Sequence, residues 1–123
     1  MLPTLFQSVI DQDDAPIVIC DLAHTMVYLN PAAEASYARY GGKALRGANL
    51  LHCHNERSRE QIVRVLAWFA ADASHNKVHT FYNAKEDKDV YMIALRDAHG
   101  ALIGYYEKHA FRTRDQAPFY DMP

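Results

Sequence analysis

Several features that mark specialised proteins are scarce in this 123-residue sequence. Only two cysteines are present, so it lacks the disulfide framework of small secreted domains, and a reducing, cytoplasmic setting is expected. No apolar run reaches the roughly 18 residues needed to cross a bilayer. Residues 1–12 also lack the cationic start and long apolar segment of a signal peptide. We therefore expect a soluble, cytoplasmic protein that does not act at a membrane.

An excess of charge of one sign is also missing, because 13 Lys and Arg nearly balance 15 Asp and Glu, giving a formal net charge of −2. The basic residues form no stripe, so nucleic-acid binding is not expected. The sequence contains no nucleophile elbow, phosphate loop, metalloprotease motif or dinucleotide-binding fingerprint. These absences predict a protein that is not an enzyme.

Apolar residues, in contrast, make up half of the sequence, enough to build the core of one domain. Their periodicity predicts helices at residues 2–10, at 32–40 and from about 55 to 72–75. It predicts strands at residues 16–20, 25–29, 78–82, 90–95 and 101–111. Because the strands are segregated from the helices, the fold class is α+β. We expect a five-stranded antiparallel sheet with helices over one face, plus an N-terminal amphipathic helix.

Three segments occur in an order that is typical of one family. Residues 28–34 run from a strand into a short helix, residues 45–49 carry a glycine before the long helix, and residues 96–104 form a hairpin that opens the last strand. In this order they resemble the PAS fold. Residues 53–58, Cys-His-Asn-Glu-Arg-Ser, resemble a Cys-His-Pro-Pro-Lys-Ser segment of a bacterial PAS subgroup, although both prolines are replaced.

The resemblance divides the chain into an N-terminal helix in residues 1–13, a PAS-like sensor domain in residues 14–113 and a tail in residues 114–123. It implies sensing, with a small molecule or cofactor between the sheet and the helices and an output through dimer or partner contacts. The apolar stripe on the first helix needs a cover, which favours a homodimer through that helix or the outer sheet face. The signalling partner is not identified. A ligand-free interaction or dimerisation module is the alternative.

The predicted pocket draws on elements that face one another in such a fold. Tyrosine suits a pocket of this kind, because it offers an apolar ring and one hydroxyl that orients a ligand. The predicted ligand-binding residues are Tyr37, Tyr40, Leu50, His54, Ile62, Leu66, Phe69, Tyr91, Ile93 and Tyr105.

The segment His52-Cys53-His54 supplies the candidates for metal binding. A neutral imidazole or a thiolate can bind zinc or haem iron, so a haem sensor using His54 or His52 is a further alternative. Adjacent side chains point in different directions, and burial of Cys53 as a small apolar group is the competing interpretation. Flavin photochemistry is not expected, because Asn49 is followed by Leu50 and not by the cysteine of light-sensing PAS domains.

Overall fold

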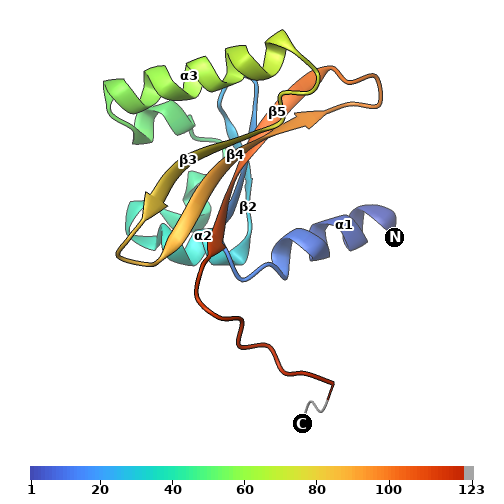
Figure 1. Ribbon diagram of the computed structural model, residues 1–123, viewed down its shortest axis with the longest axis vertical. Coiled ribbons are helices and arrows are strands. Elements are labelled where there is room, and N and C mark those ends of the chain that lie inside the picture. The colour runs from blue at the N-terminus through green and yellow to red at the C-terminus, as the bar shows by residue number, and fades with distance from the viewer. Residues whose placement is uncertain (121–123) are drawn as a thin grey trace.

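Five antiparallel strands form the centre of the computed structural model, which describes residues 1–120 (Figure 1). The strands are β1 (Ile17–Asp21), β2 (Met26–Leu29), β3 (Lys77–Asn83), β4 (Lys88–Arg96) and β5 (Leu102–Phe111). Their order in the sheet is β2-β1-β5-β4-β3, so the last strand of the sequence occupies the middle of the sheet. The predicted α+β class with a five-stranded antiparallel sheet is confirmed.

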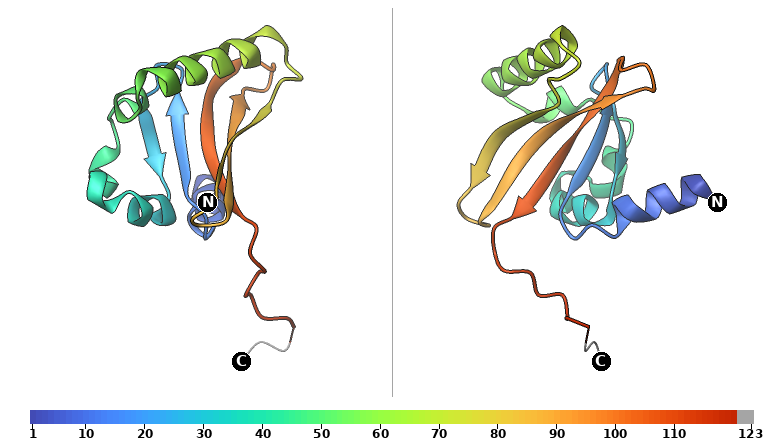
Figure 2. Two further views of the ribbon diagram at one scale, coloured as in Figure 1. Left: turned by 60° about the vertical axis from the view of Figure 1, so that its left-hand side comes forward. Right: turned by 45° about the vertical axis from the view of Figure 1, so that its right-hand side comes forward.

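Helices lie on both sides of this sheet (Figures 1 and 2). The inner face, as we call it here, is covered by α2 (Pro31–Ser36), the 3-10 helices η1 (Ala38–Tyr40), η2 (Gly42–Leu45) and η3 (Leu50–Cys53), and the long helix α3 (Glu56–Ala71). Helix α1 (Leu2–Asp11) projects from the opposite, outer face. The helix predicted at residues 32–40 therefore ends early, because the chain tightens into η1 after Ser36. Every helix within residues 1–120 is too short or too polar to cross a bilayer.

The hydrophobic core lies between the inner face and the helices. Ile62 and Phe69 of α3 are buried in it, as the periodicity of that helix predicts. The C-terminal end of α3 is attached to β4 by Arg96, whose guanidinium donates to the carbonyl oxygens of Phe69 and His75 at 2.7 and 3.0 Å. The bond to Phe69 satisfies a carbonyl group in the last turn of α3, which the helix end leaves without a partner. The position of α3 over the sheet is thus fixed at this end by a side chain of the sheet.

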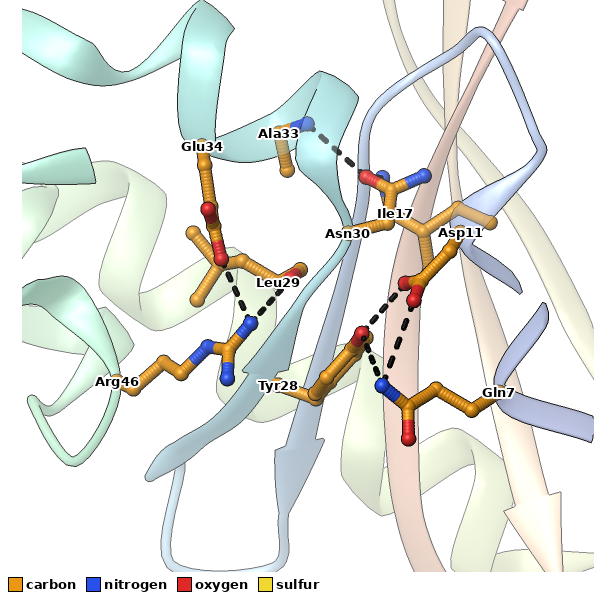
Figure 3. A network of polar contacts seen from close by, with 9 residues as sticks. All are labelled: Gln7, Asp11, Ile17, Tyr28, Leu29, Asn30, Ala33, Glu34 and Arg46. Atoms are coloured by element: carbon orange, nitrogen blue, oxygen red, sulfur yellow. Dashed lines mark hydrogen bonds and ion pairs between the residues drawn. The ribbon is translucent and has the colours of Figure 1, made fainter. Parts of the chain in front are cut away.

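Asn30 joins α1, β1 and α2 through its fully buried side chain (Figure 3). Its Oδ1 accepts hydrogen bonds from the backbone N–H groups of Ile17 and Ala33, both at 2.9 Å. Its Nδ2 donates to three carbonyl oxygens, those of Ile10, Asp13 and Ala15, at 3.1, 3.3 and 3.0 Å. The bond to Ala33 is also the N-terminal cap of α2. One amide therefore fixes the point where the chain leaves α1 and enters the sheet.

Polar contacts also attach the end of α1 to the sheet. The Tyr28 hydroxyl donates to the Asp11 carboxylate, and Gln7 Nε2 donates to the Tyr28 oxygen at 3.2 Å (Figure 3). Lys108 Nζ donates to Asp13 at 2.6 Å. Burial by itself would raise the pKa of Asp13, but the hydrogen bond and charge of Lys108 hold this pKa below its ordinary value. The apolar residues of α1 contribute little to this attachment, since none of the residues of this helix is buried.

The predicted boundaries after residues 13 and 113 fall between α1 and β1 and after β5, respectively. After β5 the chain runs away from the sheet (Figure 1). The last three residues of the predicted tail, 121–123, lie outside the described residues.

Candidate functional site

A cavity of about 630 Å³ opens on the inner face of the sheet. Strands β3, β4 and β5 form its floor, and α2, η1 and the first turns of α3 form its walls. Small-molecule sites in proteins typically measure roughly 300–1,000 Å³. The cavity therefore has the size and the position, between sheet and helices, of a ligand pocket.

Glu107 of β5 lies on the floor of this cavity. It is paired in register with Val18 of β1 and Met92 of β4, two apolar residues that are almost completely buried. Its carboxyl group makes no hydrogen bond and no ion pair with other residues between positions 1 and 120. Burial raises the pKa of Glu107 to about 7. This carboxyl group is thus close to half-protonated at neutral pH.

His109 follows two positions later on the same face of β5 and is buried, whereas Glu107 is half-buried. Its Nε2 lies 3.3 Å from the hydroxyl oxygen of Tyr37, and its Nδ1 has no hydrogen-bond partner in the described part of the chain. Burial lowers the pKa of His109 to about 4, and the positive charge of Lys88 adds to this effect. The imidazole is therefore neutral at pH 7. Burial also raises the pKa of the Tyr37 phenol well above its usual range.

A buried ammonium group completes the polar lining. Lys88 is only 3% exposed, and its Nζ lies 3.0 Å from Oε2 of Glu86 in the turn between β3 and β4. This hydrogen bond and ion pair hold the pKa of Glu86 below its usual value. The ammonium also lies 5.8 Å from the centre of the Phe111 ring. The positive charge at this end of the cavity is thus already neutralised by a carboxylate of the protein itself.

Comparison with known proteins identifies the fold. A sequence model described as the PAS fold matches residues 10–108. The chain belongs to the PAS family. No curated protein sequence matches the chain.

Solved PAS structures agree with this PAS domain in fold. A PAS domain from Colwellia psychrerythraea superposes with a TM-score of 0.66 at 13% identity, over 90% of this chain and 97% of that one. The PAS domain of BvgS from Bordetella pertussis gives 0.63 at 18% identity, over 92% and 88%. The Aer2 receptor from Vibrio cholerae, described as a dual PAS-heme oxygen sensor, gives 0.57 at 16% identity, over 80% and 95%. At these identities the similarity shows the fold alone.

The structure brings four of the predicted ligand-binding residues to the cavity. Tyr37, Tyr40, His54 and Ile62 all line it. Leu50, Leu66 and Phe69 instead pack in the hydrophobic core away from its surface. Whether the lining residues bind a ligand stays a prediction.

Tyr91 and Ile93 are not where the sequence analysis placed them. Val90 and Met92 line the cavity, so alternation along β4 directs Tyr91 and Ile93 to the outer face. There the Tyr91 ring lies 5.0 Å from that of His79 of β3. Both faces of β4 are apolar, so the sequence pattern did not distinguish the inner face from the outer one.

Tyr105 does face the helices, but it fills the core and does not line the cavity. Its side chain is fully buried, and its hydroxyl lies 2.9 Å from Nδ1 of His24. The sequence analysis missed Lys88, Glu107 and His109. The sequence does place Glu107 and His109 two positions apart in a predicted strand. Alternation puts both side chains on the same face of the sheet, and this pattern could have indicated a polar site.

The metal candidates are separated by the local backbone. His52 and Cys53 are exposed in η3, whereas His54 is half-buried and lines the cavity. Burial lowers the pKa of His54. The alternative that Cys53 is buried as a small apolar group is wrong, because the thiol faces solvent. Between residues 1 and 120, no three His, Cys, Asp or Glu side chains are grouped to hold a metal ion.

Glu107 and His109 of β5 predict opposite effects of pH on stability. The pKa of Glu107 rises from 4.5 to about 7 on folding, so stability falls as pH rises through this window. The pKa of His109 falls from 6.5 to about 4, so stability rises with pH between these values. Their contributions oppose each other between about pH 4.5 and 6.5. Between about pH 4.5 and 6.5, we expect the free energy of unfolding of Glu107→Gln to rise more steeply with pH than that of the wild type. In the same range, the free energy of unfolding of His109→Gln should fall as pH rises.

Urea denaturation of the wild type and both variants across this window measures the effect. Each slope should differ from that of the wild type by up to about 1.4 kcal/mol per pH unit, the value for one proton. The variant Glu60→Gln changes an exposed carboxylate of α3 and serves as the control. Parallel profiles for the wild type and the two β5 variants would contradict the prediction.

Proposed function

We propose that this PAS domain is a cytoplasmic sensory module that binds a small molecule in the inner-face cavity and catalyses no reaction. The observation that carries the proposal is the pair Glu107 and His109. Buried polar groups in proteins are almost always hydrogen-bonded. His109 Nδ1 is a buried atom without a partner within residues 1–120, and the half-buried carboxyl group of Glu107 is also unpaired there. Both side chains line the cavity. A bound ligand would supply the missing partners.

We further propose that ligand binding is transmitted through a homodimer. Four apolar side chains of α1 are more than half exposed: Leu2, Leu5, Phe6 and Val9. An apolar groove of about 330 Å³ lies where the end of α1 meets the outer face, between Ile10, Ile17, Leu95 and Tyr106. A second copy would cover both surfaces. Ligand binding on the inner face would then alter how the two subunits are arranged, because the sheet connects the cavity on one face to α1 on the other.

Filling the cavity tests the ligand proposal. Ser58 lies in the first turn of α3 and lines the cavity, whereas Arg57 beside it is exposed and does not. We expect the protein purified without denaturation to carry a bound mass in native mass spectrometry, or to gain thermal stability with members of a small-molecule library. A ligand at 100 times its Kd contributes about 2.7 kcal/mol. Ser58→Trp should abolish both signals, and Arg57→Trp should retain them.

The same sample distinguishes the alternatives. A Soret band that is lost in His54→Ala but kept in His52→Ala would assign haem, since His54 lines the cavity and His52 does not. A folded protein with no bound mass and no stabilising compound would favour the ligand-free interaction module. Light scattering gives the mass in solution, and a monomer at every concentration would overturn the dimer proposal.

A further inference from the structure

Glu107 occupies a position where an aliphatic residue would cost less free energy. It lies on the middle strand of the sheet, with Val18 and Met92 beside it in the neighbouring strands. An ionised carboxylate in such surroundings is unfavourable unless a partner compensates its charge. Between residues 1 and 120, the protein supplies no such partner. Departures of this kind from the rules of core composition are expected at functional sites.

Two acidic residues line the cavity, and they differ in this respect. Glu86 is exposed in the turn before β4 and is already paired with the ammonium group of Lys88 at 3.0 Å. Glu107 is half-buried and unpaired within the described residues. Of the two carboxyl groups in the cavity, that of Glu86 is thus neutralised by the protein, and that of Glu107 has no positively charged partner among the described residues.

We propose that the ligand of this cavity carries a cationic nitrogen group, such as an amine, an amidine or a protonated N-heterocycle, which pairs with Glu107. This inference rests on the proposed function, because it specifies the ligand of the same site. The walls support it, since the cavity is lined by the aromatic side chains of Tyr37, Tyr40 and Phe81. Aromatic rings attract cations through their electron-rich faces, and a carboxylate binds an amidinium through two parallel hydrogen bonds.

The other charged groups around the cavity do not compete for Glu107. Arg39 donates to the Tyr40 hydroxyl at 2.9 Å and lies over the Tyr40 ring. Lys85 is exposed in the turn before β4. The remaining titratable groups that line the cavity or lie beside Glu107 are Tyr37 and Tyr40 of the α2–η1 wall, His54 after η3, Glu86 and Lys88 of the β4 end, Tyr105 and His109 of β5, and Cys20 of β1.

Cation binding is coupled to proton release. Because the pKa of Glu107 is raised to about 7, the carboxyl group is largely protonated below neutral pH in the free protein. A cation pairs with the carboxylate, so the protonated acid must first transfer its proton to the buffer. The affinity for a permanently charged ligand should therefore fall by up to tenfold for each pH unit below about pH 7.

Three compounds of nearly the same size test the inference: benzamidine, which is cationic, benzamide, which is neutral, and benzoate, which is anionic. Their dissociation constants can be measured by ligand-observed NMR at pH 6 and pH 8. We expect benzamidine to bind at least tenfold more tightly than the other two compounds at pH 8, and to lose about tenfold in affinity at pH 6. Glu107→Gln should remove this preference, whereas Glu60→Gln, which changes an exposed carboxylate of α3 outside the cavity, should retain it.

The outcomes separate this inference from the proposed function. Tighter binding of benzamide or benzoate, or a benzamidine preference that survives in Glu107→Gln, would overturn the cation assignment. So would the absence of binding by all three compounds in a protein that binds another molecule from the library. The absence of any ligand would overturn the proposed function, and the inference with it. The pH dependence is measured on the wild type, so the test holds even if Glu107→Gln fails to fold.

Discussion

Asn30→Asp is expected to lower the free energy of unfolding by about 3–5 kcal/mol at pH 7, since breaking a buried charged or hydrogen-bonded network has this magnitude. The carboxylate keeps an acceptor for the N–H groups of Ile17 and Ala33. It replaces the Nδ2 donor, however, with an oxygen that faces three carbonyl groups. The substitution thus puts an uncompensated negative charge at a position that is fully buried.

Lower pH should reduce this loss. The new acid gains a donor when it is protonated, so its pKa is raised in the folded protein and the variant becomes relatively more stable as pH falls. Urea denaturation at pH 7 and pH 5 measures both effects. Asn55→Asp is the matched control, because Asn55 caps α3 from an exposed position and aspartate is an equally good cap. Equal losses in the two variants would show that the buried amide has no special role.

Gly104→Ala is the second substitution with a large expected effect. Gly104 lies in β5 opposite Asp21 of β1, and a Cβ atom at this position would overlap the backbone carbonyl oxygen of Cys20. A backbone atom cannot move aside as a side chain can, so β1 and β5 must separate. We expect a loss of about 3 kcal/mol, at the upper end of the usual range for overpacking.

Thermal and urea denaturation of Gly104→Ala measure this loss directly. Gly100→Ala is the comparison, because nothing lies within 4 Å of its added Cβ and only its φ of +82° is unfavourable. That variant should lose about 1 kcal/mol through backbone strain alone. A smaller loss for Gly104→Ala than for Gly100→Ala would mean that the two strands separate without cost.

The parts of this structure that were predictable from sequence depend on local chemistry. The start of α2 follows from Asn30-Pro31, in which an amide caps the helix and a proline occupies its first turn. The buried stripe of α3 follows from the spacing of Ile62 and Phe69. In both cases the residues that decide the outcome are a few positions apart.

The cavity lining was less predictable, because it depends on pairings between distant strands. Alternation divides β4 into two faces, but both Tyr91 and Met92 are suitable for a core, so only the completed sheet shows which one faces the helices. The isolation of Glu107 has the same origin. Its neighbours Val18 and Met92 are fixed by a register that joins strands from both halves of the chain.

The position of β5 also has a consequence for how the sheet folds. This strand is the last in the sequence, yet it lies between β1 and β4. In the folded sheet, β1 pairs with β2 and β3 pairs with β4, and the two hairpins share no hydrogen-bonded strand pair except through β5. The two hairpins are joined only by β5, residues 102–111, which also carries Glu107 and His109. The cavity floor is therefore completed only when β5 makes long-range contacts with both hairpins, and contacts of this kind limit folding rates.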